Sequence, residues 1–391
     1  MNNQDNFEIV VKTMQGLEDV LIQELQALGI EEITKHKRAV SFNGNLEKLY
    51  KANLYCRTAI RVLVPIYKFQ LQNENELYRG IQQIDWNEYL TNSDTLAVDS
   101  AVHSPYFNHS NYVSLKTKDA IVDQFRDRFG KRPSVELDNP DLRINIHIND
   151  NQCEVLLDSS GYSLHKRGYR INQNAAPLNE ALAAGMILLS GWQKDCDFYD
   201  PMCGSGTILM EAATFARNIA PGKNRSFGFM KFKNYDKELW KKLHQEAIDN
   251  ETDFQYNIYG SDISDKSIYI SKNNIIHSGF DDYIKLEKVA FEKLTPKGKK
   301  GLIIMNPPYG ERIEKDELFY FYELIGDTLK QKFAGFNCFI LGGNLEAFKY
   351  IGLKPARKFT LFNGKIECKY QKFELYRGSK KAKYQNMNNN D

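Results

Sequence analysis

An apolar stretch of the chain runs directly into Asn306-Pro307-Pro308-Tyr309. The exocyclic amine of adenine or guanine is a poor nucleophile because its lone pair is delocalised into the ring, so acceptors aimed at its N–H groups favour attack on a methyl group. The Asn306 side-chain oxygen and the Pro307 carbonyl are two such acceptors. Tyr309 offers a stacking face, worth roughly 1–3 kcal/mol per base. We therefore predict a catalytic motif made of Asn306, Pro307, Pro308 and Tyr309; the alternative is a proline turn that closes a strand.

A second motif, DPMCGSGT at residues 200–207, follows a short apolar strand and opens a helix. Gly204 and Gly206 let the backbone turn sharply and approach a ligand closely. The free N–H groups of the helix start then point into the crevice where doubly wound sheets bind ligands. The phosphate-binding pattern GxxxxGK[ST] is absent, and the acid Asp200 also argues against a phosphate. A carboxylate at this position suits a cation such as an amino group.

Asp262 ends the next apolar strand, where a carboxylate can accept hydrogen bonds from the two hydroxyls of a ribose. Asp200 and Asp262 together fit a ligand that has an adenosine and an ammonium group but no phosphate. This description matches S-adenosylmethionine. An ordinary tight turn next to an acidic strand end is the alternative interpretation.

Residues 217–240 look like an insertion, because Asp262 follows the glycine turn at far more than the roughly 20 residues typical of a dinucleotide-binding unit. The segment interleaves cations with phenylalanines, namely Lys223, Arg225, Lys231 and Lys233 with Phe227, Phe229 and Phe232. This pattern suits a single-stranded nucleic acid. A solvated loop anchored by its phenylalanines explains the pattern equally well.

The elements that must position these motifs change character near residue 170. Before it, alternating patterns predict a compact α+β arrangement, with strands at 6–14, 39–44, 61–69, 95–102, 142–150 and 152–160 and helices at 17–29, 45–55 and 112–130. Pro65 predicts that the strand at 61–69 lies at the edge of a sheet.

After residue 178, solid apolar strands alternate with helices, which is typical of a parallel sheet covered on both faces. The predicted strands are 197–200, 256–262, 283–291, 301–308 and 336–343. Asn363-Gly364 between two alternating runs predicts a terminal antiparallel hairpin over 358–378. The expected fold class is α/β, with a Rossmann-like seven-stranded sheet.

The overall charge allows a local basic surface but excludes a wholly basic binder, since 52 Lys and Arg face 50 Asp and Glu, for a formal net charge of +2. Cations cluster at 165–170 and along and just after the helix predicted at 112–130. The predicted RNA contacts are Lys166, Arg167, Arg170, Lys116, Arg126, Lys131 and Arg132. Because acids occupy the same helix, a salt-bridged solvent face is the alternative.

The six cysteines form no CxxC pair and show no zinc-ligand spacing, so we expect reduced thiols, no metal site and a cytoplasmic protein. The longest apolar runs are too short to span a bilayer, and the polar N-terminus has no signal-peptide core, so no membrane partner is expected. The polar segment 379–391 is predicted to be a disordered tail. The oligomeric state stays open.

The combination of DPMCGSGT, GSDIS and NPPYGER resembles the THUMP-domain class I methyltransferases that modify the exocyclic N2 of guanine in RNA, above all the bacterial 23S ribosomal RNA guanine-N2 methyltransferases. Members are often labelled N6-adenine-specific DNA methylases because NPPY is shared. The resemblance covers nearly the whole chain. It implies a ferredoxin-like domain at 1–65, an RNA-binding THUMP domain at 66–165 and an S-adenosylmethionine-dependent methyltransferase domain at 166–378.

The resemblance also implies which residues line the cofactor site: Asp200, Pro201, Cys203, Gly204, Gly206, Thr207, Asp262, Ile263, Pro177 and Leu178. Relatives commonly place an Asp after the third strand, near the adenine amine, whereas this chain has VAFEKL at 289–294. That departure leaves the adenine contact open, with backbone atoms near Phe291 as the candidate.

The favoured interpretation is an S-adenosylmethionine-dependent RNA methyltransferase that acts on an exocyclic base amine, with guanine N2 of 23S ribosomal RNA as the first choice. An adenine-N6 DNA or RNA methyltransferase is the alternative enzyme, because the motif alone does not separate the two. A catalytically silent RNA-binding or ribosome assembly factor is the alternative from another class. The intact run from Asn306 to Tyr309 argues against it.

Overall fold

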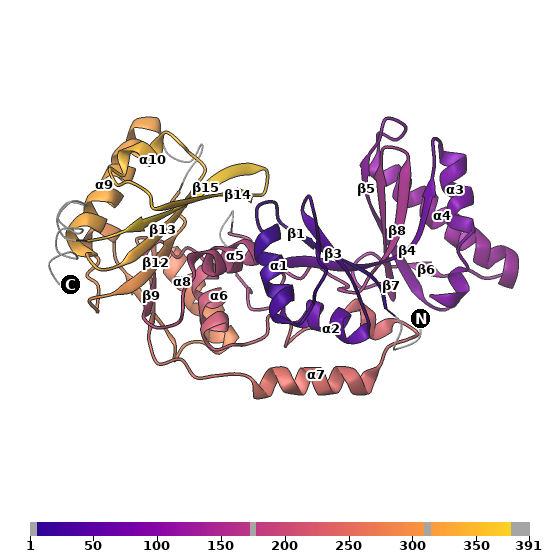
Figure 1. The fold of residues 1–391 in the computed structure, drawn as a ribbon, viewed down its shortest axis with the longest axis horizontal. Coiled ribbons are helices and arrows are strands. Elements are labelled where there is room, and N and C mark those ends of the chain that lie inside the picture. Colours follow the sequence, from indigo (N-terminus) through magenta and orange to yellow (C-terminus); the bar gives the residue numbers. More distant parts are fainter. Residues whose placement is uncertain (1–5, 173–176, 309–313, 377–391) are drawn as a thin grey trace. The chain divides into compact units, whose positions relative to one another are not determined.

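The computed structural model describes residues 6–172, 177–308 and 314–376, and the chain divides into two compact units (Figure 1). The first unit comprises Met1–Thr13, Leu21–Lys166 and Ala220–Asp249. The second comprises Met14–Val20, Arg167–Ile219 and Asn250–Asp391. Tyr309 and the segment 379–391, about which the sequence made predictions, lie outside the described residues.

The first unit is built on one continuous eight-stranded sheet in the order β2-β3-β1-β4-β8-β7-β5-β6. Its strands are β1 (Phe7–Thr13), β2 (Thr34–His36), β3 (Ala39–Gly44), β4 (Ala59–Gln70), β5 (Thr95–His103), β6 (Ser134–Val135), β7 (Leu142–Asn149) and β8 (Gln152–Asp158). Its helices include α2 (Leu46–Tyr55), α3 (Glu74–Gln82), η1 (Trp86–Glu88) and α4 (Ser110–Phe129), together with α1 (Glu18–Ala27) from Leu21 onward. Antiparallel pairing of β4 with both β1 and β8 makes the sheet continuous.

The prediction that Pro65 places its strand at a sheet edge is wrong for the strand as a whole, because β4 lies in the middle of the sheet order. Proline is tolerated there for a local reason. Pairing with β1 covers only Ala59–Leu63, and the register to β8 shifts between Pro65 and Tyr67. A residue without an N–H therefore sits where one side of the strand has no ladder and the other is irregular.

The segment that the sequence marked as an insertion packs into the core of the first unit. It contains η2 (Gly228–Lys231) and α7 (Lys237–Asp249). Phe229 is 1% exposed and stacks on Tyr50 at 4.2 Å between ring centroids. The sequence left two interpretations of this segment open: a surface for single-stranded nucleic acid, or a loop anchored by its phenylalanines. The packing agrees with the anchored loop.

The second unit contains a seven-stranded sheet in the order β11-β10-β9-β12-β13-β15-β14. Its strands are β9 (Asp197–Asp200), β10 (Ile258–Asp262), β11 (Ile284–Lys288), β12 (Gly301–Met305), β13 (Asn337–Gly342), β14 (Arg357–Asn363) and β15 (Ile366–Glu374). β9 to β13 are parallel, and β14 and β15 form an antiparallel hairpin. The α/β class, the seven strands and the hairpin at Asn363-Gly364 are confirmed; Gly364 has φ +64°, as the turn requires.

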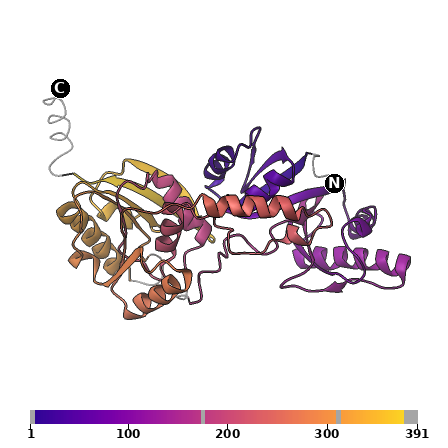
Figure 2. The same cartoon turned by 90° about the horizontal axis from the view of Figure 1, so that it is seen from below.

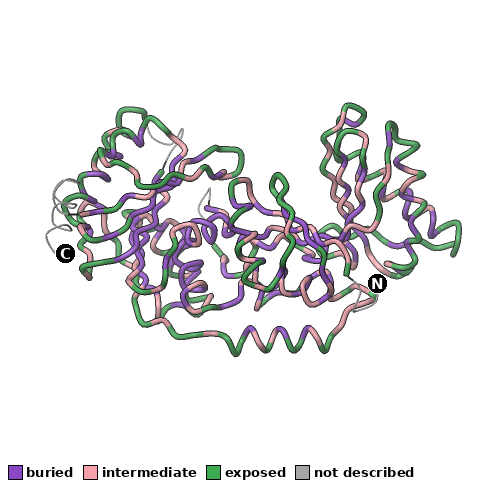
Figure 3. Tube along the Cα trace, viewed as in Figure 1, coloured by how far each residue is buried: buried purple, intermediate pink, exposed green. Residues whose placement is uncertain are grey.

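Two apolar layers cover this sheet because successive side chains of a strand point to opposite faces. Phe198 belongs to the layer formed with α5 (Glu180–Ser190), α6 (Thr207–Ala216) and α8 (Asp265–Ser278). Its neighbour Tyr199 belongs to the layer formed with η3 (Phe291–Lys293), α9 (Lys315–Lys332) and α10 (Ala347–Tyr350). Figure 2 shows the helices around the sheet, and Figure 3 shows its strands as largely buried. Within the described ranges, no helix is long and apolar enough to cross a membrane.

Candidate active site

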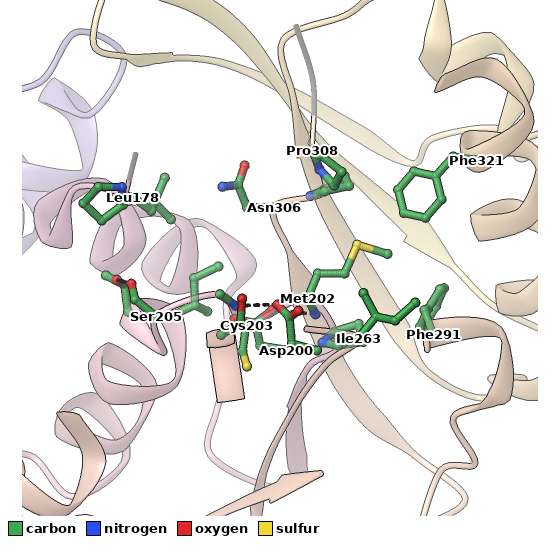
Figure 4. Close-up of a pocket in the computed structure, with 18 of the residues that line it drawn as sticks. Leu178, Asp200, Met202, Cys203, Ser205, Ile263, Phe291, Asn306, Pro308 and Phe321 are labelled. Atoms are coloured by element: carbon green, nitrogen blue, oxygen red, sulfur yellow. Dashed lines mark hydrogen bonds between the residues drawn. The ribbon is translucent and has the colours of Figure 1, made fainter. Parts of the chain in front are cut away.

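A cavity of about 490 Å³ opens at the carboxyl ends of β9, β10 and β12 in the second unit (Figure 4). β9 lies between β10 and β12, so the cavity sits where the strand order reverses, the position at which open α/β sheets bind ligands. It brings together residues of all three sequence motifs. The predicted residues that line it are Pro177, Leu178, Asp200, Pro201, Cys203, Gly204, Thr207, Asp262, Ile263, Phe291, Asn306, Pro307 and Pro308.

The glycine turn between β9 and α6 needs its two glycines for conformational reasons. Gly204 and Gly206 have φ +56° and +82°, a region that other residues rarely adopt. Gly206 caps α6 and does not itself line the cavity. The Ser271 hydroxyl donates to the Gly204 carbonyl at 2.8 Å, which ties the turn to α8. The turn is therefore held against α8.

Asp262 at the end of β10 is part of the same structure. Its Oδ2 accepts a hydrogen bond from the Gly204 N–H at 3.0 Å, and its Oδ1 accepts one from the Ser264 N–H at 2.9 Å. Each carboxylate oxygen has further lone-pair capacity. Asp262 can therefore fix the turn and still accept from two hydroxyl groups of a ligand.

Asp200 is buried at the end of β9 with an incomplete set of partners. Its Oδ1 accepts from the Met202 N–H at 3.3 Å, while its buried Oδ2 receives no hydrogen bond from any residue that the structure describes. Burial, reinforced by the charge of Asp262, raises the pKa of this carboxyl well above its ordinary value. A cationic ligand group would remove this penalty, as the sequence predicted for Asp200.

Asn306 follows β12 and has the second orphaned acceptor of the cavity. Its buried Oδ1 accepts no hydrogen bond within the described parts of the chain. In Figure 4 the Asn306 side chain lies on the same hollow as Asp200, Met202 and Pro308. An unsatisfied buried acceptor costs about 1–3 kcal/mol, so a ligand N–H placed here recovers that energy. Tyr309, the last residue of the predicted motif, lies outside the described residues.

The structure adds lining residues that sequence reasoning missed: Met202, Ser205, Ile208, Ser267, Ala290, Glu292, Phe321, Asn363 and Ile366. Glu292 was within reach of the sequence argument, since it stands beside Phe291 in the segment where relatives have an acid. Asn363 and Ile366 flank the hairpin turn between β14 and β15. Their approach to the cavity depends on how the hairpin folds back, which no local motif encodes.

The prediction that Arg167 and Arg170 contact RNA does not fit the structure. The Arg167 side chain is 5% exposed and pairs with Glu211 at 3.5 Å. The Arg170 side chain is 14% exposed and pairs with Glu180 at 3.3 Å. Both guanidinium groups point into the second unit, because buried carboxylates there require a counter-charge.

The other predicted RNA contacts lie in the first unit. Lys116 on α4 lies over the Tyr78 ring at 5.2 Å, and Arg126 pairs with Asp123 at 2.8 Å. The salt-bridged alternative therefore describes Arg126. Lys131 and Arg132 follow α4, and like Lys166 they are exposed.

Fold and cavity together define a class of protein: a Rossmann-like methyltransferase whose nucleoside pocket ends in an Asn-Pro-Pro motif. Family comparison narrows the class. Residues 167–372 match the RMKL-like methyltransferase domain, 72–158 the THUMP domain and 8–63 the RlmL ferredoxin-like domain. The chain belongs to the RMKL-like methyltransferase family.

Individual relatives agree with this family. A protein of Synechocystis sp. named as an RNA methyltransferase is 42% identical over 361 residues, which cover 92% of this chain and 94% of the relative. The ribosomal RNA large subunit methyltransferase K/L of Methylococcus capsulatus is 40% identical over 364 residues, covering 91% of this chain and 49% of the relative. This chain thus spans about half the length of the K/L relative. The solved structure of the methyltransferase SMU.472 with S-adenosylhomocysteine is 30% identical, with a TM-score of 0.86 and coverage of 96% of this chain and 100% of that one.

The cavity fits S-adenosylmethionine on observations of this chain. The orphaned Asp200 oxygen suits the ammonium group, and Asp262 suits the ribose hydroxyls. Burial raises the pKa of the Cys203 thiol well above its ordinary value, so Cys203 is a neutral part of the wall and no thiolate nucleophile. The cofactor is S-adenosylmethionine.

Proposed function

We propose that this chain is an RNA methyltransferase that transfers a methyl group to the exocyclic N2 of guanine in 23S ribosomal RNA. The observation that carries the proposal is the orphaned Asn306 Oδ1, which shares one cavity with Asp200 and Asp262. The THUMP domain and the ribosomal RNA methyltransferases among the relatives support RNA as the substrate. With such a substrate, we expect the enzyme to work in the cytoplasm.

Two carboxylates and the glycine turn would hold the cofactor, which supplies an electrophilic methyl group when bound. Asp262 accepts hydrogen bonds from the ribose hydroxyls, and Asp200 accepts from the ammonium group. The turn at Gly204 leaves backbone close to the ligand because no Cβ intervenes. Apolar lining residues such as Ile263 and Phe291 exclude water from the nucleoside.

Asn306 and Pro307 activate and orient the amine of the base. The Asn306 Oδ1 and the Pro307 carbonyl would accept hydrogen bonds from its N–H groups, which would localise the lone pair on nitrogen and favour its attack on the methyl group. The thioether product would leave as the sulfur keeps the bonding pair, and the proton released from the amine would pass to solvent. Pro308 and Phe321 provide apolar surface beside this position. A base within a helix cannot reach the cavity, so the target guanine is unstacked or flipped out before reaction.

The first unit would bind RNA through its exposed cations. Lys131, Arg132 and Lys166 are exposed and can contact phosphates, and Lys116 lies against an aromatic ring that can stack on a base. Such contacts add affinity and position the substrate without reading the target base directly.

The test is a reaction of the full chain with large-subunit ribosomal RNA and S-adenosylmethionine carrying an isotope-labelled methyl group. Nucleoside mass spectrometry should place the label in N2-methylguanosine. Label in N6-methyladenosine would instead support the adenine-specific alternative. If S-adenosylhomocysteine binds by calorimetry but no RNA acquires label, the chain is the silent RNA-binding factor and the proposal fails.

A further inference from the structure

Residues 170–172, which follow soon after the chain re-enters the second unit at Arg167, form a strap whose side chains and backbone bond to residues beside the cofactor cavity. Arg170 is its central residue. One guanidinium nitrogen, Nη2, donates to the Leu178 carbonyl at 2.8 Å and to the Thr207 hydroxyl at 2.9 Å. The same nitrogen lies 3.3 Å from Glu180 Oε1. Arg170 itself does not line the cavity, whereas Leu178 and Thr207 do.

These two partners belong to different walls of the cavity. Leu178 precedes α5, while Thr207 begins α6 directly after the glycine turn. Because a single side chain bonds to both, their separation depends on Arg170. The planar guanidinium holds this nitrogen in a fixed position, which a lysine ammonium on a flexible stem does not reproduce.

Asn274 on α8 provides a second hold on the same strap. It is fully buried, and its Oδ1 accepts from the N–H groups of Ile171 and Asn172, each at 3.1 Å. Its Nδ2 donates to the Asn172 carbonyl at 2.9 Å and to the Ser205 carbonyl at 3.0 Å. Ser205 lies in the glycine turn, so the strap is tied to this turn at a second point.

We propose that Arg170 is a positioning residue for cofactor binding, which fixes the distance between the Leu178 wall and the Thr207 wall. This role builds on the proposed function, because the cavity must bind S-adenosylmethionine for the spacing to matter. It also explains why a cation that the sequence assigned to RNA lies inside the catalytic unit. Arg170 acts through Leu178 and Thr207 and does not touch the reacting atoms.

Arg167 offers a matched control. It belongs to the same buried charge cluster, but it pairs with Glu211, which does not line the cavity. Arg167→Lys and Arg170→Lys each keep the positive charge and remove one guanidinium from this cluster. A merely structural role predicts equal effects of the two changes, whereas a positioning role predicts a selective effect of Arg170→Lys.

The experiment measures S-adenosylhomocysteine binding by calorimetry for the full-length chain and both variants, with thermal unfolding to compare their stability. We expect Arg170→Lys to weaken binding about tenfold or more, in line with hydrogen bonds to charged groups. Arg167→Lys should bind within about twofold of the unmodified chain. In steady-state methylation, Arg170→Lys should raise KM for S-adenosylmethionine and leave KM for RNA unchanged. Unaltered binding by Arg170→Lys, or equal weakening by both variants, would overturn the positioning role.

Thr207→Val keeps the test decisive if Arg170→Lys does not fold. It removes one of the two hydrogen-bond acceptors that Arg170 joins, a pair of contacts called here the Arg170 clamp, and it preserves side-chain shape. Thr207→Val should weaken binding on its own, and a value equal to that of the unmodified chain would contradict the clamp. Combined with Arg170→Lys, it should add less than its separate effect, since both changes break one interaction. A chain that binds S-adenosylhomocysteine with the expected Arg170 dependence but methylates no RNA would refute the proposed function and leave the clamp intact.

Discussion

The glycine turn at 200–207 and the basic–aromatic segment within 217–240 both look like ligand-binding stretches in the sequence, yet the structure uses them differently. The first lines a cavity in which Asp200 and Asn306 each keep a buried acceptor without a described donor. The cations and aromatic rings of the second stretch bond and pack within the first unit. The binding site is therefore marked by buried acceptors that line a cavity and have no described donor, and residue types alone do not reveal this combination.

Arg225 shows how the second stretch bonds within the first unit. Its guanidinium lies 3.9 Å from the centroid of the Tyr162 ring and donates to the carbonyls of Ser160 at 3.3 Å and Tyr162 at 2.5 Å. Lys231 donates to the Pro140 carbonyl at 3.0 Å, and Lys233 donates to the Leu90 carbonyl at 3.2 Å. These interactions hold the loops of the first unit in place.

The largest expected effect concerns the stability of the first unit. Phe229→Ala should destabilise the chain by about 3–5 kcal/mol, because it leaves a cavity where a 1%-exposed ring stacks on Tyr50. Chemical denaturation with intrinsic fluorescence measures this change. Phe129→Ala, at a ring that is 48% exposed, is the matched control and should cost far less. If Phe229→Ala kept full stability and lost only RNA affinity, the segment would be an RNA-binding surface after all.

Asn306→Ala should lower the rate of methyl transfer about 10²–10³-fold, the size of effect seen when one preorganised polar partner of a reacting group is removed. Cofactor affinity should stay nearly unchanged, because Asp200 and Asp262 remain. Single-turnover methylation and S-adenosylhomocysteine calorimetry measure the two quantities. Asn344→Ala, which removes a cap bonded to the N–H groups of Glu346 and Ala347, should leave both unaltered. An Asn306→Ala variant that turns over normally would rule out the acceptor role.

Binding of S-adenosylmethionine should become tighter as the pH rises and should release protons. The pKa of Asp200 is raised in the free protein by burial and by Asp262, so the carboxyl holds its proton to higher pH than usual. A cation favours the charged carboxylate, so binding of the cofactor displaces that proton. For one titrating group, the affinity rises by at most tenfold per pH unit. Calorimetry in buffers of different ionisation enthalpy counts the protons. Asp200→Asn should abolish the release; release that persists in this variant would assign the proton to another group.

The smallest effect is expected at the RNA contacts of the first unit. Lys131→Ala and Arg132→Ala should each weaken RNA binding a few-fold and reduce the slope of log affinity against log salt by about one phosphate contact. Lys233→Ala is the control from the basic–aromatic segment, because this lysine is already committed to backbone carbonyls. Equal losses of RNA affinity in all three variants would show that the cations after α4 and those of the basic–aromatic segment contribute alike to RNA binding.

Local motifs account for what the sequence could predict of the site. The glycines of the turn, Asp262 and the Asn306 run each stand at the end of an apolar strand, and parallel strands bring their ends to one edge of a sheet. The hairpin followed from Asn363-Gly364 for the same local reason. Phe291 was expected to line the cavity, and it does.

Nonlocal packing explains the errors. The orientation of Arg170 depends on Glu180 and Thr207, which no spacing rule connects to it. The central position of β4 depends on the pairing of strands that are far apart in the chain. Burial of Phe229 requires Tyr50, which precedes it by more than a hundred residues, so composition alone could not decide whether that ring faces RNA or a core.

The discontinuous first unit has a consequence for how the chain matures. The chain leaves the second unit after Ile219 and returns to it at Asn250. Asn218 Nδ2 donates to the Asn250 carbonyl at 2.8 Å, so these two positions lie side by side. The core around Tyr50 stays incomplete until Ala220–Asp249 has been synthesised. By that time β9 and α6 have already been translated. The core of the first unit can therefore be completed only after part of the second unit has been made, while the second unit still awaits β10 to β15.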